Sequence, residues 1–224
     1  MDFKGVLLVA KKDLKIEARS RDTLSFMFVF AFVILVMFNF SAEPFSESLM
    51  DVAPGLLWFV FIFTGMLGLS RAFIKEKDAG TLEGLRLTPL GANEILIGKM
   101  LYNLVLILIV EIIALPLFIG IFNYQIAGSV LDTIFVLTLG NIGFVVVGSF
   151  MSAIILSSRS RELVLQLLVL PILVPIIVPT ILALRKIMIY GESLPTVLEI
   201  RLIVAYIIIM STLSFLLFSY VLEE

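Results

Sequence analysis

Long apolar runs separated by short polar segments dominate the chain. A helix needs about 20 mostly apolar residues to cross the roughly 30 Å hydrocarbon core of a bilayer. Six stretches approach or exceed that length, and they are residues 24–40, 56–69, 100–122, 131–156, 163–184 and 202–222. The second run is short, but its flanks can extend it to full thickness. The pattern therefore predicts an all-α polytopic membrane protein with six transmembrane helices in a single domain.

Residues 1–22 show a different pattern, in which apolar residues recur at spacings of four, three and four. These are Phe3, Leu7, Ala10 and Leu14, while the lysines occupy other faces. This spacing predicts an amphipathic surface helix. Its apolar stripe would lie at the lipid headgroup boundary as a membrane anchor, or the helix would contact a cytoplasmic partner.

The distribution of basic residues predicts the orientation. Short cytoplasmic loops retain Lys and Arg. Of the sixteen Lys and Arg residues, only Arg185, Lys186 and Arg201 lie between the fifth and sixth spans, and the others lie in segments that would share the opposite side. We therefore expect both termini to be cytoplasmic in an inner membrane. Residues 42–54 would form an external loop, and residues 185–201 an external re-entrant or loop segment.

Composition narrows the classes of function. The chain is 61% hydrophobic and 15% charged, whereas soluble domains contain about 25% charged residues. The formal net charge of -2 gives no argument for binding nucleic acid. The chain has neither His nor Cys, which removes zinc sites, thiolate chemistry and His-based catalysis. We expect no catalytic residues and no metal site.

The most informative polar segment is residues 73–99, between the second and third spans. Thr81 could cap a short helix that ends at Thr88-Pro89, and a second short helix could begin near Asn93. The first helix would present an apolar knob ringed by charge, formed by Leu82, Leu85 and Leu87. Such a knob suits docking into the groove of a partner protein. Alternatively, the leucines sink into the membrane interface.

Several residues within the apolar runs have polar or helix-breaking character. Glu111 is an intramembrane carboxylate, which either pins helices together or lines a substrate pathway. Pro171, Pro175 and Pro179 recur every four residues and each removes a backbone hydrogen bond, so they form a hinge or a fixed kink. Small residues of the fourth span permit close helix approach, and they are Gly140, Gly143, Gly148 and Ser152.

The segment from Gly80 to Leu90, Gly-Thr-Leu-Glu-Gly-Leu-Arg-Leu-Thr-Pro-Leu, resembles the permeases of type-2 ABC exporters, as does the Gly98-Lys99 pair entering the third span. Within that superfamily the chain is similar to the CcmB family, the haem exporter subunit of cytochrome c maturation. Further resemblance lies in Leu-Gly-Asn-Ile-Gly at residues 139–143 and in residues 157–175. It covers essentially the whole chain, including the number of spans.

The resemblance implies a half-transporter that pairs with a second copy of itself and with cytoplasmic CcmA-like ATPase subunits. CcmC-like and CcmD-like membrane subunits are further implied partners. The segment between spans two and three would be the coupling helix, and residues 1–22 the connecting helix. Carried over by position, the ATPase-coupling residues are Glu76, Gly80, Leu82, Glu83, Leu85, Thr88 and Pro89. The substrate implied is haem, and ATP would bind to the partner.

The residues agree with this division of labour. No Walker A sequence surrounds Gly98-Lys99, because Asn93 stands at the first glycine position and Met100 at the Ser/Thr position. Without His or Cys, only Met and Tyr remain as axial haem ligands. Either haem passes transiently through an apolar path, or the chain transmits motion that releases a haem-loaded chaperone. The alternatives are a type-2 permease for a drug, lipid or glycan, and a membrane scaffold without transport.

Overall fold

The computed structural model describes residues 3–42, 46–72, 80, 84, 87–155, 161–194 and 197–223. Within these residues all regular secondary structure is helical. The helices are α1 (Phe3–Ser20), α2 (Asp22–Ala42), α3 (Ser46–Ala72), α6 (Ala92–Ile121), α7 (Val130–Ile154), α8 (Arg161–Met188) and α9 (Glu199–Glu223). All of them except α1 are long and apolar enough to cross a membrane. The six predicted spans are thus confirmed.

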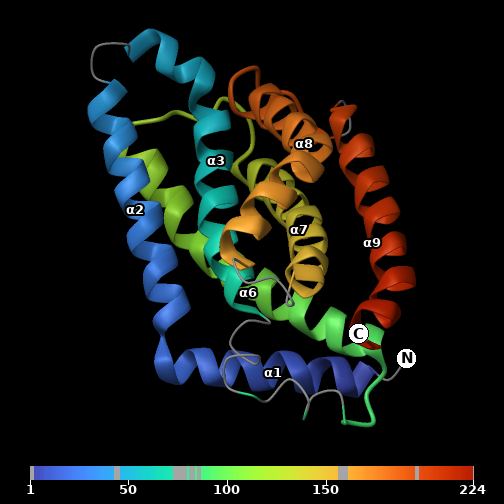
Figure 1. Cartoon of the computed structure of the whole chain (residues 1–224). Helices are drawn as coiled ribbons and strands as arrows, with labels where there is room; N and C mark the ends of the chain where they lie inside the picture. Colours follow the sequence, from blue (N-terminus) through green and yellow to red (C-terminus); the bar gives the residue numbers. More distant parts are fainter. Residues whose placement is uncertain are drawn as a thin grey trace.

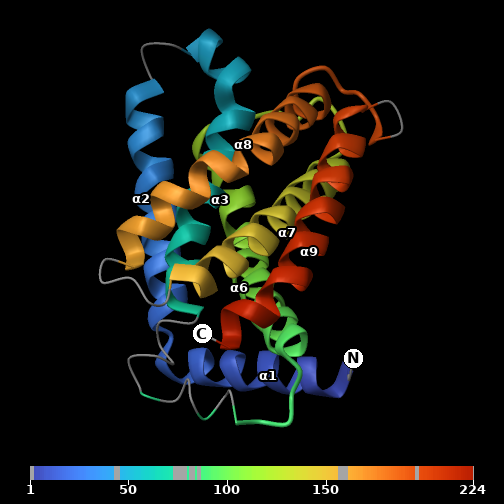
Figure 2. The same ribbon diagram turned by 45° about the vertical axis from the view of Figure 1, so that its right-hand side comes forward.

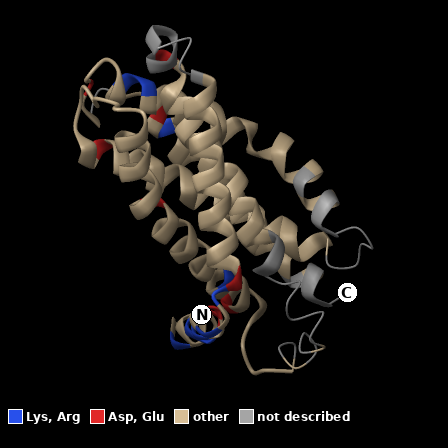
Figure 3. Cartoon of the chain, turned by 90° about the vertical axis from the view of Figure 1, so that its left-hand side faces the viewer, with Lys and Arg blue, Asp and Glu red and all other residues tan. Residues whose placement is uncertain are grey.

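The six apolar helices run along the length of the bundle, and α1 lies across one end of it (Figure 1). We call this the α1 end and the opposite one the far end. Most charged residues among those described lie near these two ends, and the ribbon between them contains almost none (Figure 3). A bundle of this kind matches a bilayer with polar surfaces on both sides.

Helix α7 forms the centre of the bundle and contacts α3, α6, α8 and α9. Its predicted small residues allow close approach. A Cβ atom at Gly143 would lie 1.9 Å from Ile176 Cδ1, and one at Gly148 would lie 2.1 Å from Leu69 Cδ1. Helix α9 runs along the outside of the bundle beside α7 and α8 (Figure 2). Helices α2 and α9 are the least buried of the spans.

Two boundary predictions were wrong. Residues 46–54 were expected in an external loop, but α3 already begins at Ser46 and contains Pro54. A single proline removes only one backbone hydrogen bond, and the packing of the buried Ala53, Pro54 and Leu57 outweighs that loss. Nor is there a separate short helix near Asn93, because α6 runs without interruption from Ala92.

The connection between α8 and α9 lies at the far end. Helix α8 extends to Met188 and α9 begins at Glu199, so both ends of the 185–201 segment are helical. Gly191 takes a left-handed conformation, with φ +69°. The ends are joined by an ion pair, since Lys186 Nζ lies 3.0 Å from Glu199 Oε1. The described residues between these helices contain no re-entrant α-helix.

Candidate functional site

The described part of the 73–99 segment leads directly into α6. Glu76, Leu82, Glu83 and Leu85 lie outside the described residues, as does the Thr81 cap. Gly80 is exposed and left-handed at φ +66°, while Thr88 is half-buried and Pro89 is exposed. The non-helical part of the segment ends where Gly91 N–H donates to Glu94 Oε2 at 3.2 Å and Glu94 N–H donates to Gly91 O at 2.9 Å. These bonds satisfy two amides at the start of α6.

Helix α6 is longer than a bilayer core requires. Its 30 residues extend about 45 Å, against roughly 30 Å of hydrocarbon. Helix α1 packs against the extra turns of α6 at the α1 end. A Cβ atom at Gly98 would lie 2.6 Å from Val9 Cβ and 3.0 Å from the backbone oxygen of Val6. A Cβ atom at Gly5 would lie 2.6 Å from Leu90 Cδ2. The end of the 73–99 segment therefore touches α1 as well as α6.

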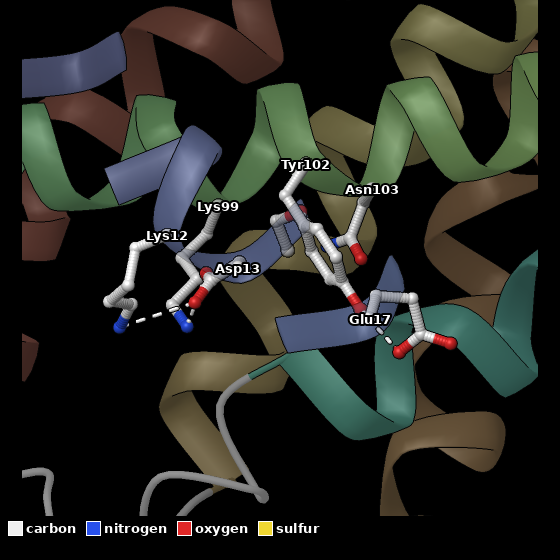
Figure 4. A network of polar contacts seen from close by, with 7 residues as sticks. Lys12, Asp13, Glu17, Lys99, Tyr102 and Asn103 are labelled. Carbon is white, nitrogen blue, oxygen red and sulfur yellow. Dashed lines mark hydrogen bonds and ion pairs between the residues drawn. The ribbon is translucent and has the colours of Figure 1, made fainter. Parts of the chain in front are cut away.

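A buried ion pair joins α1 to α6 (Figure 4). Asp13 Oδ2 lies 2.8 Å from Lys99 Nζ, and Lys12 Nζ lies 3.2 Å from Asp13 Oδ1. Lys99 is only 1% exposed and Asp13 is 8% exposed. Charges this deeply buried are maintained only when they are paired. The ion pair thus fixes which residue of α1 faces which residue of α6.

Glu17 connects α1 to both α2 and α6. Its Oε1 accepts from the backbone N–H of Leu24 at 2.9 Å, and its Oε2 accepts from the Tyr102 hydroxyl at 3.4 Å. Arg21 turns the chain between α1 and α2 with φ 57°, a conformation that non-glycine residues adopt infrequently. Glu17 therefore stabilises the sharp corner that Figure 1 shows between these helices.

Helix α3, which ends just before the 73–99 segment, and α6, which begins within it, are both hydrogen-bonded to the last turns of α7. Asn103 of α6 donates through Nδ2 to Ser149 Oγ at 3.0 Å. Ser152 Oγ donates to the backbone oxygen of Leu69, near the end of α3, at 3.0 Å. Helices α3 and α6, which the segment connects, are therefore both held by α7.

The sequence did not reveal the buried face of α1. This face consists of Gly5, Val6, Val9, Ala10, Asp13 and Glu17. Of the predicted apolar stripe, Ala10 is buried, whereas Phe3 and Leu7 are 67% and 46% exposed. The available signal was that Asp13 and Glu17 follow Val6 and Val9 at helical spacing on one face.

Glu111 lies between α6 and α7 and is 3% exposed. Its Oε2 accepts from Asn141 Nδ2 at 2.7 Å, and its Oε1 accepts from the Thr138 hydroxyl at 3.4 Å. Both carboxylate oxygens are therefore satisfied by α7. No group of three or more acidic side chains that could hold a metal ion occurs among the described residues.

The three predicted hinge prolines lie within the continuous helix α8. Pro171 and Pro175 are exposed, and Pro179 is buried. Two hydroxyls bond to carbonyls in this stretch. Tyr206 of α9 donates to the backbone oxygen of Ile172, and Thr180 Oγ1 donates to that of Ile176 at 2.7 Å. Neither carbonyl is one that a proline deprives of its backbone donor, but the bond from Tyr206 fastens this stretch of α8 to α9.

Known proteins resemble the chain along most of its length. The sequence profile of the CcmB protein family matches residues 4–222. The heme exporter protein B of Rhodobacter capsulatus is 26% identical over 163 residues, which are 73% of this chain and 74% of the relative. The protein of the same name from Paracoccus denitrificans is 25% identical over the same shares, and that from Escherichia coli is 29% identical over 72 residues. The chain belongs to the CcmB family.

Proposed function

We propose that the chain is the membrane permease subunit of an ABC complex that delivers haem for the maturation of c-type cytochromes. The family match and the name heme exporter protein B of its relatives support haem as the substrate. The six apolar helices supply the membrane domain. ATP is hydrolysed by a separate CcmA-like subunit on the cytoplasmic side of the inner membrane, where both termini also lie.

The observation that carries this proposal is the junction of α1 and α6 beside the 73–99 segment. If the ATPase displaces that segment, the displacement reaches Gly91 and the first turn of α6. Because Asp13 and Lys99 join α6 to α1, and Glu17 joins α1 to α2, these helices respond together. The bond from Asn103 to Ser149 and the bond from Ser152 to Leu69 extend the same response to α7 and α3. Rigid contacts of this kind transmit motion between packed helices.

We assign Glu76, Gly80, Leu82, Glu83, Leu85, Thr88 and Pro89 to contact with the ATPase. Glu111 serves helix packing, since α7 satisfies both of its oxygens. Pro171, Pro175 and Pro179 form a fixed part of the bundle, supported by the bond from Tyr206. Neither role requires a bound cofactor.

The exposed helices offer surfaces for membrane partners. Helix α2 exposes Phe26, Val29, Phe32 and Met37, and α9 exposes a similar apolar row. A second copy of the chain and CcmC-like and CcmD-like subunits cover part of this surface, and lipid covers the rest. Because the chain has no His or Cys, the usual strong haem ligands must come from these other subunits.

The test is copurification of the chain with the ATPase, followed by measurement of ATPase activity, the haem absorption spectrum of the complex and c-type cytochrome content of the cells. Glu83→Lys reverses a charge on the proposed contact and should abolish association or the coupled ATPase activity. Glu192→Lys makes the same charge change at the far end and serves as the matched control. Melting temperatures of both variants identify simple misfolding.

Two results would overturn the proposal. Unchanged coupled ATPase activity in Glu83→Lys would remove the 73–99 segment from the ATPase contact. Normal c-type cytochromes in cells that lack the chain would exclude haem delivery. A drug, lipid or glycan would then be the substrate if ATPase coupling persists, and a scaffold role would remain if it does not.

A further inference from the structure

An open pocket of about 410 Å³ lies at the far end, between α2, α3 and α8. Its volume falls within the range of small-molecule sites, about 300–1,000 Å³. The wall is apolar and includes Phe38, Leu56, Phe59 and Ile181. Phe38 and Phe59 meet edge to face, with ring centroids 6.4 Å apart. An apolar chain would fit this wall.

Two opposite charges also line the pocket, Asp51 on α3 and Arg185 on α8. They form no ion pair with each other. The Nε atom of Arg185 is inaccessible to solvent and has no hydrogen-bond partner among the described residues. The neighbouring Lys186, in contrast, is paired with Glu199. The Arg185 side chain as a whole is only half-buried and lines the pocket, so its guanidinium can donate to an anionic ligand oxygen there.

Asp51 is exposed, and its negative charge acts on the neighbouring Tyr124. Burial is the main cause that raises the pKa of Tyr124, and the negative charge of Asp51 raises it further. An anionic ligand that approached Arg185 would meet this same charge. The pocket therefore favours a ligand that carries a cationic group beside its anionic one.

The depth of the residues matches the layers of a membrane. Asp51 begins one apolar span, Arg185 lies near the end of another, and Phe59 lies about two helical turns deeper than Asp51. Charged groups at the ends of spans lie at headgroup level, and the apolar wall lies in the hydrocarbon. A ligand that fits the pocket therefore has its charged groups at headgroup level and its apolar part deeper in the membrane.

We propose that this pocket binds a zwitterionic phospholipid with a primary ammonium group, of the phosphatidylethanolamine class. Its phosphate accepts from Arg185, its ammonium donates to Asp51, and an acyl chain lies along Phe38 and Phe59. A second pocket beside α2, lined by Thr23, Phe26 and Leu67 among others, has no charged side chain among the described residues of its lining and offers no such headgroup contact there. Haem is the poorer fit to the charged pocket, because its two carboxylates would face Asp51.

The experiment is native mass spectrometry of the full chain in detergent with equimolar palmitoyl-oleoyl phosphatidylethanolamine, phosphatidylcholine and phosphatidylglycerol. We expect phosphatidylethanolamine to be retained roughly tenfold over both others, the difference of one charge-assisted hydrogen bond. Asp51→Asn should remove the preference over phosphatidylcholine, whose quaternary amine cannot donate. Arg185→Gln should weaken all three lipids, and the exposed far-end control Arg201→Gln should change nothing.

Equal or stronger retention of phosphatidylglycerol, or an unchanged preference in Asp51→Asn, would overturn the proposal. So would retention of no phospholipid. In a last measurement, haem is added to the lipid mixture as a competitor. If haem displaces the lipid, and Arg185→Gln also weakens the retention of haem added without lipid, the pocket binds haem instead. None of these outcomes depends on the ATPase coupling proposed above.

Discussion

Asp13 and Lys99 raise the question of why a membrane protein buries an ion pair where apolar side chains would pack at less cost. Replacing a buried pair by well-packed apolar residues is often neutral or stabilising, so the pair contributes specificity more than stability. Here the specificity is one of register. A slip of α1 by one turn along α6 would leave both charges buried without this contact, whereas apolar residues would tolerate the slip.

A double-mutant cycle tests this role. Asp13→Asn and Lys99→Met should each destabilise the protein by roughly 1–3 kcal/mol, because each leaves a buried polar group less satisfied. The double variant should lose less than the sum, by roughly 0.5–3 kcal/mol. Melting temperatures in detergent provide the measurement, with the exposed Lys15→Met as control on the same helix. Strict additivity would mean that the two charges do not act as a pair.

Glu111 allows a cleaner separation of packing from transport. Glu111→Gln keeps the shape and the capacity for hydrogen bonds with Asn141 and Thr138, so we expect near-normal melting temperature and c-type cytochrome content. Glu111→Leu leaves the buried Asn141 amide without its acceptor and should cost about 1–3 kcal/mol. Thr138→Val, which removes the longer bond, should cost less. A stable Glu111→Gln protein that fails to support cytochrome maturation would instead indicate a substrate pathway.

Sequence reasoning found some of these residues and missed others for a physical reason. Glu111 is conspicuous because no charge surrounds it in its apolar run. Asp13 and Glu17 are not, since they lie among lysines in a segment that reads as water-exposed. Their partners Lys99 and Tyr102 come from a helix more than 80 residues later. No local pattern reports such long-range contacts.

At the scale of helices, hydropathy predicted the six spans because lipid imposes one requirement on each. It could not predict that α3 begins at Ser46 or that α6 continues back to Ala92. Outside the hydrocarbon, helix ends depend on tertiary contacts. The first turns of α6 pack beside α1 and are helical, although they contain Gly98, and glycine is unfavourable inside a helix.

That glycine provides the prediction for the α1–α6 contact. A Cβ atom at Gly98 would collide with Val9 Cβ and with the backbone of Val6, and neither can rotate away. We expect Gly98→Ala to separate the helices and cost about 1–3 kcal/mol by overpacking, outweighing the gain in helix propensity. It should also reduce the coupled ATPase activity.

Gly120→Ala is the matched control, because Gly120 lies on the same helix, is exposed, and has nothing within 4 Å of a Cβ atom. We expect it to be neutral or to stabilise by up to about 1 kcal/mol. Equal melting temperatures and ATPase activities for the two variants would show that α1 does not need to approach α6 this closely.

The whole molecule has two ends of different chemistry. The α1 end holds the buried Asp13–Lys99 pair, the basic face of α1 and the described end of the 73–99 segment, where it enters α6. The far end holds Arg185, Lys186, Arg201 and the charged pocket. If the basic residues set the orientation, the pocket faces outward and the coupling junction faces the cytoplasm. Energy would then enter at one end of α6 and act on groups at the other.

The orientation can be measured because the chain contains no cysteine, so one introduced thiol is the only one present. Lys15→Cys at the α1 end and Gln125→Cys at the far end both replace exposed residues. A membrane-impermeant maleimide should label Gln125→Cys in intact spheroplasts and Lys15→Cys only in inside-out vesicles. The unmodified chain supplies the zero background. Labelling of Lys15→Cys in intact spheroplasts would place α1 outside, where no cytoplasmic ATPase could reach the 73–99 segment, and the proposed coupling would fail with it.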